Sequence, residues 1–207
     1  GGGSRQSDGP LPELHLSTEN RVAREAARLV EDGQMDLNPP YQRGSVWTLD
    51  QRVALVKSWC LGLPVPPVTI NDRTSNEWAS NNGGVNPIDS PGGHGIYGVV
   101  DGKQRLETAR AWFGGRFGVP ASWFRPEEVE ETFETPDGPY VTYDRLTRNG
   151  QTAMGFHAKL PWTTAHVGSV EAEAELYLLL NGGGTQQTDA DMANAARVAG
   201  RTATSER

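Results

Sequence analysis

Cysteines, histidines and long apolar runs are scarce in this sequence, and each shortage excludes a class of protein. Its single cysteine, Cys60, excludes an intramolecular disulfide framework, and we place it on the buried face of a predicted helix. The four histidines lack the spacing of metal ligands, which favours structural or loop roles for them. They are His15, His94, His157 and His166. No run approaches the roughly 20 apolar residues that cross a bilayer, and no signal peptide is visible. We therefore expect no membrane partner and a cytoplasmic location, in a bacterium or as a phage protein in the bacterial cytoplasm.

Excess positive charge is also missing. With 19 Lys and Arg against 26 Asp and Glu, the formal charge is -7, so no global basic field attracts nucleic acid or an anionic membrane. Any contact with DNA must come from a local patch. We expect one domain over residues 17–207, after a cloning remnant and N-terminal tail at residues 1–16. Residues 74–95 are polar and rich in Asn and Gly, which indicates an insertion that is either a lid or disordered.

The strongest local signal is a predicted strand, Ile96 to Val100, that runs into a tight turn and a helix start. The turn and the helix start read Asp101-Gly102-Lys103-Gln104-Arg105. The first N–H groups of a helix have no internal partners, and the positive end of the dipole favours a phosphate there. Lys103 and Arg105 add full charges, and Asp101 can hold Mg²⁺ or orient a hydroxyl. The alternative is an ordinary surface turn before a solvated helix.

A second signal precedes a helix that we expect from Thr48 to Leu61, where Thr48 and Gln51 have the spacing of a capping box. Two prolines keep the preceding backbone extended. The segment after them reads Tyr41-Gln42-Arg43-Gly44-Ser45-Val46-Trp47. Arg43 is well placed for an anion. The alternative makes Tyr41 and Trp47 core aromatics and Arg43 a surface charge.

A third signal follows a helix that we expect to begin near Ser169 and to end at Asn181. The next residues read Gly182-Gly183-Gly184-Thr185, before a last helix from Asp189 to Ala199. Glycines allow positive φ angles and a close approach of the backbone to a ligand. The alternative is a flexible connector between two helices.

The other elements are assigned from periodicity. The pattern predicts a helix from Ser17 to Asp32, an acidic solvated helix face within Arg125 to Pro139, and four strands. The strands are Val65 to Ile70, Arg116 to Val119, Tyr140 to Tyr143 and Phe156 to Leu160.

Taken in order, these motifs resemble the N-terminal domain of GmrSD-type restriction proteins, a branch of the ParB/sulfiredoxin-like fold. The family motifs Tyr-Gln-Arg-x-x-x-Trp, Leu-Pro-x-Pro, Asp-Gly-Gln-Gln-Arg-Leu-x-Thr and Asn-x-Gly-Gly-Thr correspond to residues 41–47, 63–66, 101–108 and 181–185. The resemblance implies an α+β fold, with a small mixed sheet surrounded by helices. Lys103 replaces the usual first Gln of the third motif. GmrSD-type proteins usually carry a C-terminal His-Asn-His nuclease domain, and we expect this chain, which ends at Arg207, to lack it.

The resemblance also implies nucleotide binding and hydrolysis, and transfer of the phosphate to an acceptor extends this idea. We expect a nucleoside triphosphate (ATP or GTP) and Mg²⁺ as cofactors. The candidate catalytic residues are Asp101, Lys103 and Arg105, with Asp101 as metal ligand. The candidate nucleotide-binding residues are Tyr41, Gln42, Arg43, Gly102, Gln104, Asn181, Gly183, Gly184 and Thr185. Two alternatives stay open: a DNA-binding module or nickase that senses modified DNA, and a non-catalytic nucleotide-sensing subunit of a separately encoded nuclease.

Overall fold

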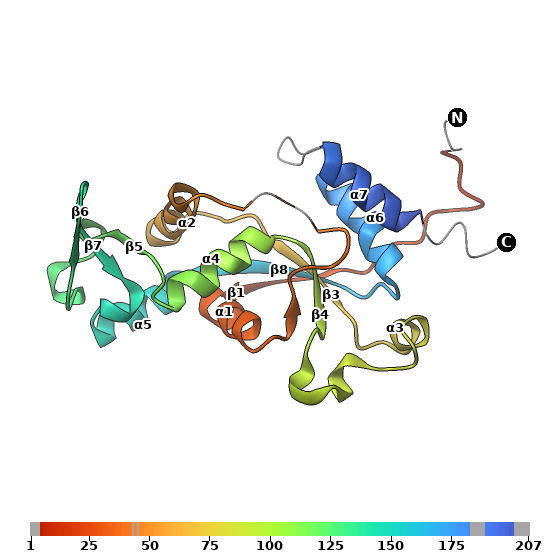
Figure 1. Ribbon diagram of the computed structural model, residues 1–207, viewed down its shortest axis with the longest axis horizontal. Helices are drawn as coiled ribbons and strands as arrows, with labels where there is room; N and C mark the ends of the chain where they lie inside the picture. Colours follow the sequence, from red (N-terminus) through yellow and green to blue (C-terminus); the bar gives the residue numbers. More distant parts are fainter. Residues whose placement is uncertain (1–4, 43, 45, 183–188, 201–207) are drawn as a thin grey trace.

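The computed structural model describes residues 5–42, 44, 46–182 and 189–200. Its centre is a five-stranded mixed sheet in the order β1-β8-β3-β4-β2 (Figure 1). The strands are β1 (Ser17–Val22), β2 (Met35–Asp36), β3 (Val68–Asp72), β4 (Tyr97–Asp101) and β8 (Lys159–Ala165). β3 pairs in parallel with β8 and antiparallel with β4, β1 pairs antiparallel with β8, and β2 pairs in parallel with β4. The sheet and its helices confirm the α+β class.

Helices flank this sheet, and a second, smaller sheet lies at one end of the molecule. The helices are α1 (Ala23–Glu31), α2 (Leu49–Leu61), α3 (Asn76–Asn81), α4 (Lys103–Phe113), α5 (Arg148–His157), α6 (Val170–Asn181) and α7 (Asp189–Ala199). The second sheet has the order β5-β7-β6 and contains β5 (Gly118–Pro120), β6 (Phe133–Thr135) and β7 (Gly138–Thr142). In Figure 1 it lies at the end opposite the packed pair α6 and α7. The described residues contain no helix long and apolar enough to cross a membrane.

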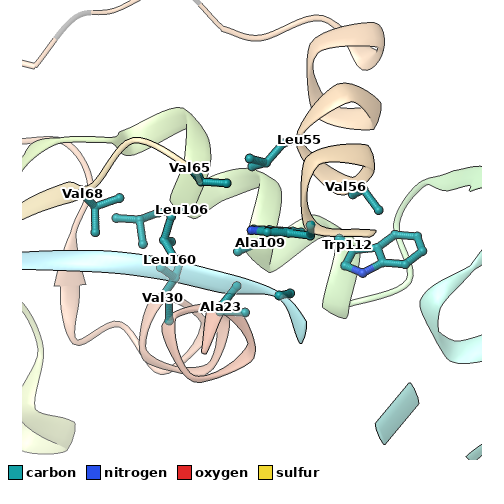
Figure 2. Packing of buried hydrophobic residues seen from close by; sticks show 14 of the residues in the cluster. Ala23, Val30, Leu55, Val56, Val65, Val68, Leu106, Ala109, Trp112 and Leu160 are labelled. Atoms are coloured by element: carbon teal, nitrogen blue, oxygen red, sulfur yellow. The ribbon is translucent and has the colours of Figure 1, made fainter. Parts of the chain in front are cut away.

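The main core forms where α4 packs against α1, α2 and the large sheet. Leu106, Ala109 and Trp112 lie three residues apart on α4 and are fully buried (Figure 2). This spacing places them on one face of the helix. Leu160 of β8 belongs to the same cluster. A smaller cluster joins α6 and α7 to β4 and contains Tyr41, Val100, Ala165, Ala174, Leu176, Tyr177, Ala195 and Val198. The two clusters together fix the start of α4 and the end of α6.

Several helix boundaries confirm the predictions made from local sequence patterns. Thr48 caps α2 in a complete capping box with Gln51, and Gly62 ends the helix with φ 69°. Ser169 caps α6, which ends at Asn181, and α7 has the predicted bounds. β3 begins three residues later than predicted, at Val68.

Other predictions were wrong where contacts distant in sequence override the local pattern. Residues 17–22 do not continue the helix of α1, because they form β1 and pair with β8 across the sheet. The strand predicted from Phe156 is the end of α5, and β8 starts only at Lys159. Cys60 is exposed rather than buried, because the inward face of α2 carries Leu55, Val56 and Trp59.

Two long segments have a secondary structure that their composition did not predict. The acidic stretch 125–139 contains no α-helix, and instead forms a 3₁₀ turn, Pro126–Glu128, and the hairpin of β6 and β7. Residues 74–95 contain α3 and the 3₁₀ turns Pro87–Asp89 and Pro91–Gly93. Further 3₁₀ turns are Ala121–Trp123 and Tyr143–Arg145.

Candidate functional site

A cavity of about 360 Å³ lies where the segment before α2, the turn between β4 and α4, and the end of α6 meet. It is lined by Gln42, Gly44, Val46, Trp47, Gln51, Asp101, Gly102, Lys103, Gln104, Arg105, Tyr177 and Asn181. No residue of 74–95 is in this lining. The lining therefore unites three segments that carry separate signals in the sequence.

Gly102 makes the turn between β4 and α4 possible. Its φ is +98°, a left-handed conformation that side chains disfavour. A Cβ at this position would meet the side chain of Val68 and would lie 3.0 Å from its Cα. The glycine therefore lets α4 start directly against the beginning of β3.

The first turn of α4 has no side-chain cap, whereas α2, α5 and α6 are capped by Thr48, Thr147 and Ser169. Gly102 stands at the N-cap and has no side chain to accept from the helix N–H groups. Because residues 102–105 line the cavity, the positive end of the α4 dipole faces it. This arrangement suits an anionic ligand.

Two cations and one carboxylate accompany this helix start. Lys103 Nζ donates to Asn38 Oδ1 at 2.6 Å. Arg105 Nη2 donates to the carbonyl oxygen of Pro67 at 2.9 Å and lies 3.6 Å from Asp101 Oδ2. The Arg105 side chain is only 16% exposed, and burial lowers its pKa, an effect that Asp101 opposes. Since a guanidinium starts from a pKa far above neutrality, Arg105 stays charged.

Two glutamine side chains hold the segment before α2 against β4 and α4. Gln42 Nε2 donates to the carbonyl oxygens of Val100, at 2.8 Å, and Val99, at 3.3 Å. Gln104 Oε1 accepts from the backbone N–H of Trp47 at 3.0 Å. These bonds fix Gln42 and Trp47 in the cavity wall.

The structure brings most of the predicted site residues together. Those that line the cavity are Gln42, Asp101, Gly102, Lys103, Gln104, Arg105 and Asn181. The predictions for Arg43, Gly183, Gly184 and Thr185 lie outside the described residues. Tyr41 is fully buried and is not part of the cavity lining.

Tyr41 instead donates its hydroxyl to Glu173 Oε2, at 2.8 Å. Burial and the neighbouring Glu173 raise the pKa of Tyr41 well above its usual range, so the phenol remains a protonated donor. No role for Glu173 is predicted from the sequence motifs. One signal for it is visible in the sequence, because a carboxylate four residues before Tyr177 falls on the apolar side of α6.

The carboxylates of the described residues do not form a dedicated metal centre. No group of three or more His, Cys, Asp or Glu side chains in these ranges could hold a metal ion. Asp101 supplies the carboxylate in the cavity lining. Mg²⁺ is commonly held by one or two carboxylates together with substrate phosphates, and Asp101 fits that arrangement.

Comparison with protein families shows which family the chain belongs to. The profile described as the N-terminal domain of the GmrSD restriction endonuclease matches residues 26–197, which include every segment that lines the cavity. The chain belongs to this family, as the four sequence motifs predicted, and the family places it in the context of restriction and phage defence. Searches of curated proteins and of solved structures gave no match.

Proposed function

We propose that the chain binds a nucleoside triphosphate in this cavity and carries out Mg²⁺-dependent phosphoryl chemistry, by hydrolysis or by transfer to an acceptor, as part of restriction or phage–host conflict. One observation carries the proposal. The uncapped start of α4 faces the cavity together with Lys103, Arg105 and Asp101.

The phosphates would lie over the first turn of α4, where the backbone N–H groups and the helix dipole favour negative charge. Lys103 and Arg105 would neutralise further charge on the phosphates. Such catalysis depends mostly on positioning and electrostatic stabilisation, for which a few charges and backbone donors suffice. Trp47, which is half-buried in the cavity wall, offers aromatic surface against which a nucleobase can pack. The volume of the cavity falls in the usual range of small-molecule sites.

Asp101 would hold Mg²⁺, which when bound neutralises charge on the phosphate oxygens. The Asp101 side chain is 36% exposed, so a ligand in the cavity can reach its carboxylate. The same carboxylate can accept a proton from a water molecule or an acceptor hydroxyl.

The decisive experiment is turnover of γ-labelled ATP and GTP with Mg²⁺, by the full chain and by its Asp101→Asn variant, with and without DNA. Asp89→Asn is the matched control, because Asp89 is exposed and lies outside the cavity lining. We expect release of labelled phosphate, or its transfer to an acceptor, that disappears in Asp101→Asn and persists in Asp89→Asn. Equal turnover in both variants would exclude Asp101 from the chemistry.

Two other outcomes would point to different functions for the same family context. Tight nucleotide binding without turnover would indicate a nucleotide-sensing subunit that controls a separate nuclease. Salt-sensitive DNA binding without nucleotide binding would indicate a module that senses DNA, although the net charge of -7 disfavours it. Absence of nucleotide binding would overturn the proposed function.

A further inference from the structure

A cluster of buried polar side chains lies next to the cavity without lining it. We call it the Glu173 network, and its members are Asp36, Tyr41, Asn71, Arg73 and Glu173. The Glu173 side chain is completely buried, and its carboxylate accepts four hydrogen bonds at 2.8 Å. Oε1 accepts from Arg73 Nε and Asn71 Nδ2, and Oε2 accepts from Arg73 Nη2 and the Tyr41 hydroxyl.

Arg73 is held on three sides. Besides Glu173, it donates from Nη1 to Asp36 Oδ2 at 2.9 Å, and its guanidinium lies 4.6 Å from the centre of the Trp78 ring. Burial opposes the charge of Arg73, but the two carboxylates outweigh it and raise its pKa. A buried ion pair adds little net stability compared with apolar residues, and its better-attested use is to fix one arrangement of the elements it joins. Here those elements are β2, the end of β3 and α6.

Two members of the Glu173 network lie next to residues that line the cavity: Glu173 on α6, and Tyr41 in the segment before α2. Glu173, Tyr177 and Asn181 follow one another at four-residue spacing along α6, so they share one face of the helix. Tyr177 and Asn181 line the cavity. On the other wall, Tyr41 directly precedes Gln42, and its ring centre lies 5.5 Å from that of Tyr177.

We propose that Glu173 and Arg73 are positioning residues, which fix α6 and the segment around Gln42 relative to each other so that the cavity holds its shape for a nucleotide. Tyr41 then acts as the link between the two walls and makes no contact with the ligand. This inference rests on the proposed function only for the identity of the ligand.

The test compares Tyr41→Phe with Tyr140→Phe in the full chain. Tyr140 serves as the control because it also donates its hydroxyl to a carboxylate oxygen at 2.8 Å, that of Asp137, but this bond is exposed and lies in β7 at the other end of the molecule. Both variants keep the aromatic ring. Two quantities are measured: amide hydrogen exchange along the chain, and the dissociation constants of ATP and GTP with Mg²⁺.

In Tyr41→Phe we expect faster exchange confined to α6 and Gln42. Nucleotide binding should weaken by at most about tenfold, because the free energy of one lost hydrogen bond to a charged group limits how far the binding-competent shape of the cavity can be depopulated. Tyr140→Phe should change neither. Arg73→Lys, which keeps the charge but cannot make the planar two-nitrogen contact with Glu173, should reproduce the Tyr41→Phe effects.

Unchanged exchange in α6 would overturn the inference, and so would exchange that rises equally in α2 and β7, because that result indicates general destabilisation. The proposed function fails separately, if the unaltered chain binds neither nucleotide. In that case hydrogen exchange still decides whether the Glu173 network positions α6.

Discussion

Arg73 binds both oxygens of the Glu173 carboxylate, with Nε 2.8 Å from Oε1 and Nη2 2.8 Å from Oε2. This two-point contact fixes the relative orientation of the end of β3 and α6, because neither side chain can rotate without losing one bond. It also means that each partner depends on the other, since a buried charge without its counter-charge is costly.

Glu173→Gln should therefore destabilise the protein by about 3–5 kcal/mol, the usual cost of breaking a buried ion pair. The new amide also places a donor where the carboxylate accepted from Arg73, Asn71 and Tyr41. Urea denaturation measures the change. Glu175→Gln is the control, since Glu175 lies on the same helix and is exposed. Similar free energies of unfolding for the two variants would show that the ion pair is dispensable.

Gly102→Ala should destabilise the chain by about 2–5 kcal/mol. The left-handed backbone costs a non-glycine residue about 1–2 kcal/mol, and overpacking against Val68 costs about 1–3 kcal/mol. Gly62→Ala isolates the first effect, because Gly62 has φ +69° but no atom within 4 Å of an added Cβ. Chemical denaturation of both variants gives the difference. If Gly62→Ala were the more damaging, the contact with Val68 would not limit this turn.

Lys103→Gln restores the residue that is usual in the family and removes one charge from the start of α4. We expect the dissociation constant of ATP or GTP to rise by about tenfold at low salt, and the difference to shrink as salt screens the charge. Titration at two salt concentrations measures this. Lys57→Gln is the control, because Lys57 is exposed on α2 and does not line the cavity. Equal affinities for both variants would exclude Lys103 from phosphate binding.

Thr48→Ala should cost about 1 kcal/mol of stability, the typical effect of removing an N-cap. The Thr48 hydroxyl accepts from the N–H of Gln51 at 3.3 Å, and the Gln51 side chain accepts from the N–H of Thr48 at 2.8 Å. Thr48→Ser keeps the hydroxyl and should be nearly neutral. Thermal unfolding compares the variants. A large loss in Thr48→Ser would indicate that the methyl group, rather than the cap, matters.

The sequence was informative where structure depends on neighbouring residues. Capping of α2 by Thr48 needs only Gln51 three residues later, and the glycine after Asp101 shows where a strand gives way to a helix. The prediction of an anion-binding helix start at residues 101–105 stays a prediction, but the residues named for it do meet in one cavity.

Contacts between segments that are distant in sequence could not be predicted from it. Residues 17–22 form a strand because β8 pairs with them, and nothing within their own sequence specifies that partner. The burial of Tyr41 and its bond to Glu173 depend on how α6 packs against β4, which periodicity does not reveal. Trp47 belongs to a motif that the sequence shows. Its place in the cavity wall, however, depends on the hydrogen bond from its backbone N–H to Gln104, which is distant in sequence.

One edge strand of the large sheet is very short, and the other carries an ion pair. β2 contains only two residues, and β1 carries Glu19 and Arg21, which form an ion pair at 2.8 Å. Very short strands and charged side chains at an edge discourage a second chain from adding a strand. The large sheet is therefore a poor template for β-linked growth from one molecule to the next.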